Sequence, residues 1–538
     1  MFTKILVLTL YILGLFLIGW WARTRWRDSA ESYFLAGRSL SPIIFLATMA
    51  ATNFSAFTVF GCSGAGYRDG YAFYPIIGFG TGFMAITFWV IGRRARELGQ
   101  SSGALTPPDL VRAAYDSRGV STLVAIVLII FTIPYLALQP IAAGYALQEL
   151  LGLDYLWGAA LVTAVITIYT LRGGLKAVAR TDALQGLIML TVLLLALILI
   201  ANQAGGLTTA GRKLMTQYPD LFSRPGGQSR YVPAIWFSFI FLWFFCDPMF
   251  PQLFQRFLAA RDNQTIRRTM LAYPFVCSIV FILPVTIGVL GRLNHPGLTG
   301  KEADRILPLL AAGLDIPILG ALVIACGLAA LMSTMDSQLL TLSSIFSQDL
   351  YPLFKKSETP NGVAARVFVV ILALAGLGLA IRPPGTILTI AQQTFTGLAV
   401  LFPTVLFGLY PSWRSSTGGI VSILVGEGAL LLAFFGHLPT WGFLSVVPIL
   451  VLTFGSYLLV AGAERLLKGQ PLAWPKAFLF SPYTWAFAAI FVLAIDWWRW
   501  GKPASLIFGW PAWIIHFLVL STLQTLVMVR WTRKSKLK

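Results

Sequence analysis

Charged residues are scarce in this sequence of 538 residues: Asp, Glu, Lys and Arg make up 11% of it and hydrophobic residues 57%. Soluble domains carry about 25% charged residues and are at most about half apolar, so this composition excludes a set of ordinary cytosolic domains. The formal charge of +19 does not indicate a nucleic-acid partner, because that requires basic residues gathered on one face of a soluble fold. The sequence therefore indicates a polytopic helical membrane protein.

Cysteine and histidine are also rare, with four and three residues respectively. No CxxC or HExxH spacing occurs, and the cysteines are typical of small buried hydrophobic residues; they are Cys62, Cys246, Cys277 and Cys326. We expect no disulfide, no zinc site and no cofactor. The string Gly61–Gly64 has the GxSG pattern of an intramembrane serine protease, but small-residue strings are common at close helix contacts. A protease is a remote alternative.

Long apolar runs dominate the sequence instead. A spanning helix needs about 20 mainly apolar residues, and that length predicts about 15 segments, with 13–15 plausible. They are 3–21, 42–67, 72–92, 120–147, 157–171, 182–202, 233–254, 270–291, 315–345, 364–382, 386–409, 417–436, 439–462, 482–498 and 507–529. The first lacks a signal-peptide cleavage motif, so we expect it to be retained. No connecting loop is long enough for a soluble domain.

Basic residues predict the orientation of these segments. The loops that follow odd-numbered segments, together with the C-terminal tail, hold 28 of the 40 Lys and Arg residues. Because cytoplasmic loops retain the positive residues, we expect the N-terminus outside and the C-terminus inside the cell membrane.

Two segments contain helix-breaking residues at membrane depth, where only protein or a water-filled cavity can satisfy the freed backbone groups. The second segment has a polar cluster within Ala50–Ala56, and the seventh has a carboxylate and two prolines within Trp243–Pro251. They lie five segments apart, as in two five-helix repeats of opposite orientation, and transporters bind substrates where such helices break. We therefore divide the chain into an N-terminal helix and linker (1–41), two repeats (42–202 and 203–409) and additional helices (410–538).

The ninth segment carries hydroxyls and a carboxylate in an apolar run, which is costly unless they face a site. Ser333, Thr334 and Ser337 are spaced so that they can surround a cation together with the carbonyl of Ala330. Alternatively, these hydroxyls bond to their own helix or to a neighbouring one. Asp182 is expected to open the sixth segment, either as a carboxylate favoured by the helix dipole with Thr181 as cap, or in a functional role.

The sequence resembles the sodium:solute symporter family, which includes proline, pantothenate and sugar cotransporters. The matching stretches occur in the family's order and are Tyr33–Arg38, Ala50–Tyr67, Thr106–Leu110, Arg172–Gln185, Pro251–Phe257 and Ala329–Leu340. The resemblance implies a leucine-transporter fold, a five-plus-five inverted repeat with extra helices, and sodium-coupled uptake of a small organic solute by alternating access.

The resemblance also implies site residues. The family's main sodium site corresponds to Ala51, Phe54, Ala330, Ser333 and Thr334, while Asp182 corresponds to an acidic residue near the inner gate. A second sodium position of some relatives corresponds to Asp336 and Ser337. The solute pocket is expected at Asn53, Ser55, Thr58, Gln139, Trp243, Asp247, Pro251 and Gln392 or Gln393.

Asp247 departs from the family resemblance, because proline-transporting members commonly have a tyrosine at this position. A buried carboxylate is costly unless it is paired. It either pairs with an amine of the solute, with Trp243 adding a cation–π contact, or is protonated in a structural or proton-binding role. The solute remains open between an amino acid such as proline and a carboxylate such as pantothenate. A sensor that acts with a separate signalling partner, and a channel, are alternatives to a symporter.

Overall fold

The computed structural model describes residues 2–22, 29–171, 173–314, 317–354, 362–471 and 481–534. In these ranges ten helices are long and apolar enough to cross a membrane, or twelve if each of two bent pairs counts as one span. Two shorter apolar helices are Phe2–Ile18 and Tyr155–Thr170. The all-helical polytopic membrane class is thus confirmed. Each expected segment coincides with a helix or bent pair, but the number of about 15 spans stays a prediction.

The first part of the chain runs from the N-terminal helix to the end of the sixth expected segment. Its elements are α1 (Phe2–Ala22), α2 (Ala30–Leu35), η1 (Ala36–Arg38), α3 (Pro42–Asn53), η2 (Phe57–Gly61), α4 (Cys62–Asp69), η3 (Gly70–Ala72), η4 (Pro75–Phe79), α5 (Gly80–Met84), η5 (Phe88–Gly92), α6 (Arg93–Ser102), α7 (Pro107–Tyr115), α8 (Arg118–Leu151), α9 (Tyr155–Thr170) and α10 (Leu175–Gln203).

The middle part contains the second bent pair. Its elements are α11 (Leu207–Gln217), η6 (Pro219–Phe222), η7 (Gly227–Ser229), α12 (Pro233–Cys246), η8 (Asp247–Met249), α13 (Pro251–Ala259), α14 (Asn263–Asn294), η9 (Gly300–Arg305), α15 (Ile306–Ala312), α16 (Pro317–Ile345), η10 (Phe346–Leu350), α17 (Tyr351–Phe354), α18 (Gly362–Ala380), α19 (Ile387–Ala399), α20 (Phe402–Leu409) and η11 (Pro411–Trp413).

The C-terminal part adds peripheral helices and one small hairpin. Its elements are α21 (Ser416–Phe434), α22 (Val446–Leu467), α24 (Pro482–Ile495), η12 (Trp497–Arg499), β1 (Leu506–Ile507), β2 (Trp510–Pro511) and α25 (Ile514–Lys534). The two strands pair antiparallel, with Leu506 opposite Pro511. Some basic residues behind the orientation prediction lie outside the described residues, namely those at 23, 25, 27, 172, 355, 356, 476, 536 and 538.

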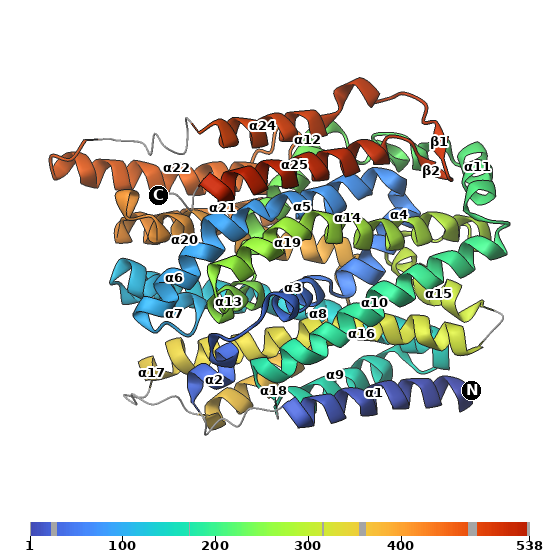
Figure 1. Ribbon diagram of the computed structural model, residues 1–538, viewed down its shortest axis with the longest axis horizontal. Coiled ribbons are helices and arrows are strands. Elements are labelled where there is room, and N and C mark those ends of the chain that lie inside the picture. Colours follow the sequence, from blue (N-terminus) through green and yellow to red (C-terminus); the bar gives the residue numbers. More distant parts are fainter. Residues whose placement is uncertain are drawn as a thin grey trace.

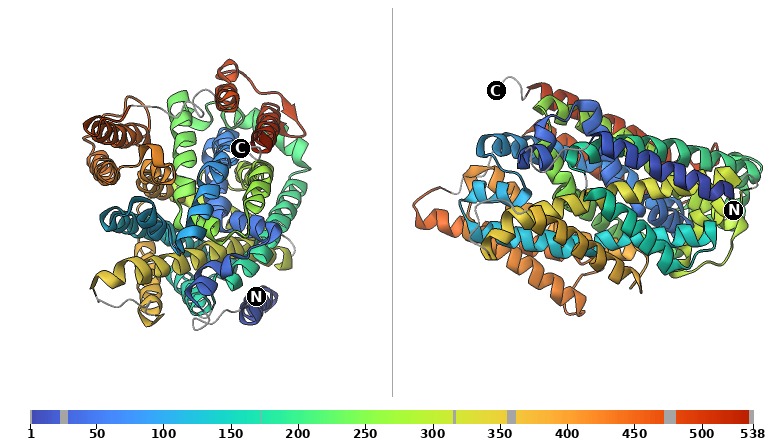
Figure 2. Two further views of the ribbon diagram at one scale, coloured as in Figure 1. Left: turned by 60° about the vertical axis from the view of Figure 1, so that its left-hand side comes forward. Right: turned by 90° about the horizontal axis from the view of Figure 1, so that it is seen from below.

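The helices lie roughly along the long axis of the molecule, with α3, α8, α10 and α16 in its middle (Figure 1). The pair α21 and α22 and the pair α24 and α25 lie at its periphery, away from α1 (Figure 2). The central helix α16 packs against α10, α8 and α1, and every residue from Val323 to Ile345 is buried. Polar side chains on α16 therefore lie in the protein interior, where they must find partners.

Both bent pairs occur where the sequence predicts a break. The segments Pro42–Asn53 and Phe57–Ala72 meet at 60°, and Pro233–Met249 and Pro251–Ala259 meet at 51°. At the first break the helix ladder is replaced by a local turn, in which Ser55 donates its N–H to the carbonyl of Asn53 at 3.2 Å. At the second, Pro251 has no N–H to continue the ladder. The repeat limits 42–202 and 203–409 stay predictions.

Candidate sodium and solute sites

The hydroxyls of α16 lie against the break of the first bent pair. Ser333 donates to the carbonyl of Ala51 at 2.9 Å and to that of Ala330 at 3.0 Å. Thr334 donates to the carbonyl of Thr52 at 3.0 Å and lies 3.3 Å from that of Ala330. The alternative in which the hydroxyls bond to their own helix and to a neighbour is thus observed, while the cation site stays a prediction. The result is a buried cluster of oxygen atoms, the donor type that small hard cations prefer.

Phe54, the remaining residue of the expected main sodium site, lies at the break itself. It caps the end of α3 with φ −87° and ψ 83°, and its N–H bonds to the carbonyl of Ala50 at 2.9 Å. Its ring packs edge-on against Phe281, with ring centroids 5.3 Å apart. The backbone of Phe54 therefore leaves the helical path one residue after Asn53, within the same turn as the carbonyls that the hydroxyls contact.

A buried arginine joins the bent pairs to the inner part of the bundle. Arg256 of α13 donates from Nη2 to Asp182 Oδ2 and to Ser337 Oγ, both at 2.8 Å. Its Nε donates to Thr48 Oγ1 at 2.9 Å, and its Nη1 donates to the carbonyl of Gln252 at 2.8 Å. Arg256 thus contacts α3, α10 and α16 from the second half of the second bent pair, and no part of its side chain is exposed.

Two carboxylates share this buried cluster. Asp182 Oδ2 also accepts hydrogen bonds from Thr48 at 2.5 Å and Thr52 at 3.1 Å. Asp336 Oδ1 accepts from Ser337 at 3.3 Å. Within the described residues, the second oxygen of Asp182 is buried and has no hydrogen-bond partner. With both carboxylates ionised, the cluster carries one more negative than positive charge, and one carboxylate oxygen is open to a further ligand.

The expectation that Asp182 opens its helix is wrong. Helix α10 begins at Leu175, directly after Gly174, so Asp182 lies about two turns inside it. Thr181 does not cap the helix, since its hydroxyl donates to the carbonyl of Val178 at 2.9 Å. The hydropathy places the start of the helix at Asp182. The connection before it already ends at Gly173 and Gly174, so the polar residues that precede Asp182 belong to the helix. The helix-dipole explanation for Asp182 is therefore removed.

A small cavity lies between the two breaks. It measures about 10 Å³, about the smallest that holds one water molecule. Four expected pocket residues line it, namely Asn53, Thr58, Trp243 and Asp247. Aromatic rings line it, with Trp243 and Phe395 centroids 5.3 Å apart and Phe57 and Trp243 centroids 5.5 Å apart. The two breaks and α19 thus converge on one aromatic chamber with a carboxylate in its wall.

Asp247 has no cationic neighbour in this chamber. None of the salt bridges in the described part of the chain includes it. Its Oδ1 accepts a weak hydrogen bond from the thiol of Cys246 at 3.4 Å. Asn53, on the facing wall, donates its amide to the hydroxyl of Tyr273 at 2.7 Å. A carboxylate buried among aromatic rings without a counter-charge is poised for a ligand that brings one.

The other expected pocket residues lie outside the cavity lining. Gln139 accepts the N–H of Ala56 at 3.1 Å, and Ser55 Oγ accepts that of Phe57 at 3.1 Å, so both stabilise the first break. Pro251 begins α13. Gln392 is half-buried and Gln393 is exposed, both on α19.

A second charged network ties the opposite end of the first bent pair to its surroundings. Arg68 of α4 pairs with Asp304 of η9 at 2.9 Å, and Asp304 Oδ2 accepts the N–H of Ile387 at the start of α19 at 2.8 Å. Tyr231 donates to Asp69 at 2.8 Å. Burial raises the pKa of the Asp304 carboxyl, while Arg68 opposes that rise. The aromatic chamber therefore lies between two networks, one around Arg256 and one around Asp304.

Comparisons with known proteins agree with this architecture. The sodium:solute symporter family model matches residues 33–426. The chain is 27% identical over 467 residues to a sodium/pantothenate symporter of Haemophilus influenzae, covering 86% of this chain and 96% of that protein. It is 27% identical over 456 residues to a sodium/proline symporter of Escherichia coli K12, covering 81% and 88%. A substrate-bound outward-open structure of a Na⁺-coupled sialic acid symporter covers 86% of this chain and 98% of its own, with TM-score 0.73 at 19% identity.

The chain belongs to the sodium:solute symporter family. The resemblance inferred from its motifs is thereby confirmed, as is the leucine-transporter type of fold. Its function is sodium-coupled solute transport. In this symporter the hydroxyls of α16, the two breaks and the aromatic chamber form one continuous region.

Sequence reasoning missed several residues of this region. Arg256 belongs to a matching stretch and was counted among the basic loop residues that predict the orientation, but its contacts with Asp182 and Ser337 were not predicted. Tyr135 and Phe395 line the solute cavity without having been expected there. Tyr135 could have been found, since it lies one helical turn before Gln139 on the same face of α8. Phe395 carries no such signal in a chain with 39 phenylalanines.

Proposed function

We propose that this symporter imports a small amine-bearing solute of the amino-acid type, such as proline, together with sodium from outside the cell. The observation that carries the proposal is the lone carboxylate of Asp247 in the aromatic chamber. An amine would neutralise it, and Trp243 and Phe57 offer faces for cation–π contacts. An anionic solute such as pantothenate would instead bring a second negative charge to Asp247, so it is the less favoured solute.

The main sodium site is proposed between the first break and α16. The carbonyls of Ala51, Phe54 and Ala330 and the hydroxyls of Ser333 and Thr334 would supply the ligands. The hydrogen bonds between these hydroxyls and the carbonyls of Ala51 and Ala330 support this, because they bring the oxygens together. Sodium would bind the hydroxyl lone pairs and carbonyls at the same position, so that the first break and α16 become crosslinked by the ion.

A second cation position is proposed beside Asp182, Asp336 and Ser337. The excess negative charge of this cluster and the unpartnered oxygen of Asp182 support one further sodium ion or proton. Arg256 already supplies one fixed positive charge there. We therefore assign at most one additional cation to this cluster.

In alternating access, the ion pairs at one end of the chamber would break while those at the other end stay formed. The network of Arg68 and Asp304 would close the outer end of the chamber, and the cluster around Arg256 would close the inner end. Sodium that binds first between the first break and α16 would raise the affinity for the solute, a coupling that is necessarily reciprocal. The start of α1 and the end of α25 lie at opposite ends of the bundle, which supports the proposed placement of the two termini on opposite sides of the membrane (Figure 1).

Uptake into proteoliposomes tests the proposal. The purified symporter is reconstituted, and entry of radiolabelled proline and pantothenate is followed with and without an inward sodium gradient. Sodium-dependent, saturable uptake of an amine-bearing solute is expected. Preference for pantothenate would overturn the amine assignment, binding without uptake would favour a sensor, and flux that does not saturate would favour a channel.

A further inference from the structure

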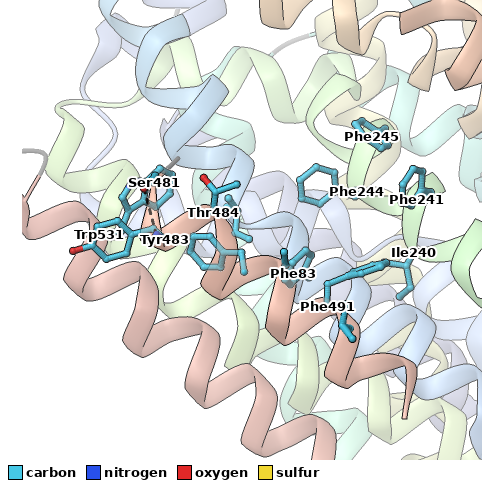
Figure 3. A pocket seen from close by; sticks show the side chains of 14 residues that line it. Phe83, Ile240, Phe241, Phe244, Phe245, Ser481, Tyr483, Thr484, Phe491 and Trp531 are labelled. Atoms are coloured by element: carbon cyan, nitrogen blue, oxygen red, sulfur yellow. Dashed lines mark hydrogen bonds between the residues drawn. The ribbon is translucent and has the colours of Figure 1, made fainter. Parts of the chain in front are cut away.

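A second, larger cavity lies on the other side of α12 from the solute chamber. This groove has a volume of about 400 Å³, within the range of about 300–1,000 Å³ typical of small-molecule sites. It runs between α5, α12, α24 and α25, and six of its 14 lining residues are phenylalanines, among them Phe83, Phe241, Phe244 and Phe491 (Figure 3). Such a lining excludes a hydrated solute and suits a hydrocarbon chain.

The polar side chains of the groove gather at one end. Ser481, Tyr483 and Thr484 all come from the start of α24, and Trp531 of α25 lies beside them, away from Phe241 and Phe245 (Figure 3). Tryptophan and tyrosine are typical of the membrane–water interface, where one part of the ring is apolar and another is wet. The groove therefore runs from the interface into the apolar part of the bundle.

Basic residues lie near this polar end, on the last turns of α25 and at the start of α14. Arg530 and Arg533 flank Trp531 on α25 and are both exposed. Arg267 of α14 reaches the same turn, since its Nε donates to Thr532 Oγ1 at 2.8 Å, and Arg268 beside it is exposed. Among the described residues, none of these four arginines has a carboxylate within salt-bridge distance. Positive charge thus lies near the polar end of the groove, since Arg530 and Arg533 are within two residues of Trp531 and Arg267 contacts the residue after it.

We propose that the groove binds one acyl chain of an anionic phospholipid, whose headgroup phosphate is held by Arg530, Arg533 and Arg267. The charge of the arginines selects the anionic headgroup, and basic pockets between helices at the cytoplasmic face are known to recognise such lipids. The phenyl rings hold the chain, and the hydroxyls of Ser481 and Thr484 lie at the depth of the ester groups. The proposed lipid contacts no residue of the sodium site or of the solute chamber.

The position of the groove gives the lipid an influence on transport. Phe244 and Phe245 face the groove, while Trp243 and Asp247 of the same bent pair face the solute chamber. A chain in the groove packs between α12 and the peripheral helices α24 and α25. Because the bent pair has to move when the chamber opens, the bound lipid biases that movement.

Native mass spectrometry of the full-length symporter tests the site. The protein is extracted from vesicles of equal amounts of phosphatidylcholine and phosphatidylglycerol, and retained lipids are counted. The wild type is expected to retain one phosphatidylglycerol. The variant R530Q/R533Q should bind it roughly 30-fold more weakly, because each basic residue near an anionic surface contributes a factor of about 5. Ala488→Trp, which places an indole at the groove, should lose the retained lipid altogether.

Matched controls separate this site from general lipid adhesion. Ala489→Trp alters the next residue, which is also exposed but does not line the groove, and should retain the lipid. R212Q/K213Q removes two exposed charges on α11 and should likewise retain it. Equal retention of phosphatidylcholine by the wild type, equal retention by the two tryptophan variants, or a second copy of the chain in place of lipid would each overturn the proposal.

Discussion

Arg256 and Asp182 form an ion pair of 2.8 Å in which neither side chain is exposed to any extent. Arg256 lies on α13, in the second bent pair, and Asp182 lies on the central helix α10. The guanidinium also donates to Ser337 on α16. A buried ion pair contributes little net stability, because desolvation offsets the attraction, but removal of one partner leaves an uncompensated charge. The pair therefore holds the inner ends of three helices in one arrangement.

Arg256→Gln is expected to destabilise the symporter more than R256Q/D182N does. The single variant leaves Asp182 buried without its counter-charge, a loss of about 3–5 kcal/mol, whereas the double variant removes both charges. Thermal unfolding of the purified proteins measures the difference. The partly exposed pair Asp109–Arg112 is the control, and its neutralisation should cost about 1 kcal/mol or less. Equal melting temperatures for single and double variants would show that the two charges are not coupled.

The double substitution S333A/T334A should raise the sodium concentration needed for half-maximal uptake by about tenfold or more. Both hydroxyls are proposed ligands, and the loss of even an outer-sphere partner of a metal ion costs about that much affinity. Ser343→Ala is the matched control on the same helix, because among the described residues its hydroxyl bonds only to the carbonyl of Leu340. Sodium dependence of initial uptake rates is the measurement. An unchanged half-maximal concentration in a folded double variant would remove the main site from this position.

Much of the region could be predicted because its signals are local. A carboxylate, two prolines or a run of hydroxyls inside an apolar segment indicates an interior site, because such groups are energetically costly in contact with lipid. Ser333, Asp247 and both breaks were predicted in this way. The start of α10 was misplaced for the same reason. The helix begins at Leu175, whereas the hydropathy rises only at Asp182, because the first two turns of the helix carry the exposed Lys176 and Arg180.

Other features depend on contacts between distant segments, which no local pattern encodes. Arg256 lies 74 positions from Asp182 and 81 from Ser337. The pair Arg68–Asp304 and the groove beside α12 likewise require the packed bundle. Gln392 was assigned to the pocket from its place in the family pattern, and this assignment stays a prediction, since Gln392 is half-buried and does not line the cavity. The same helix contributes Phe395 instead.

Asp247→Asn should lower the affinity for an amine-bearing solute by about tenfold or more, because hydrogen bonds to a charged group contribute about 1.5–3 kcal/mol. Affinity for a neutral analogue without the amine should change little, which distinguishes loss of the pair from damage to the chamber. Asp349→Asn is the control, as a carboxylate bound to Thr106 outside the chamber. Competition against radiolabelled proline measures both affinities. Equal losses for solute and analogue would contradict a charge pair.

Gly64→Ala is expected to reduce uptake about tenfold without weakening sodium binding. A Cβ on Gly64 would overlap the carboxylate of Asp304 and crowd the backbone of Ala303, so the ion pair with Arg68 could not close. Overpacking of this kind costs about 1–3 kcal/mol. Here it would destabilise the outward-closed conformation, which transport requires. Gly428→Ala is the control, since a Cβ there meets no atom within 4 Å. Initial uptake rates and sodium-dependent thermal stabilisation are measured together. Wild-type uptake by Gly64→Ala would mean that closure of this network is not needed for transport, whereas loss of sodium stabilisation would mean that the substitution disturbs the first break instead.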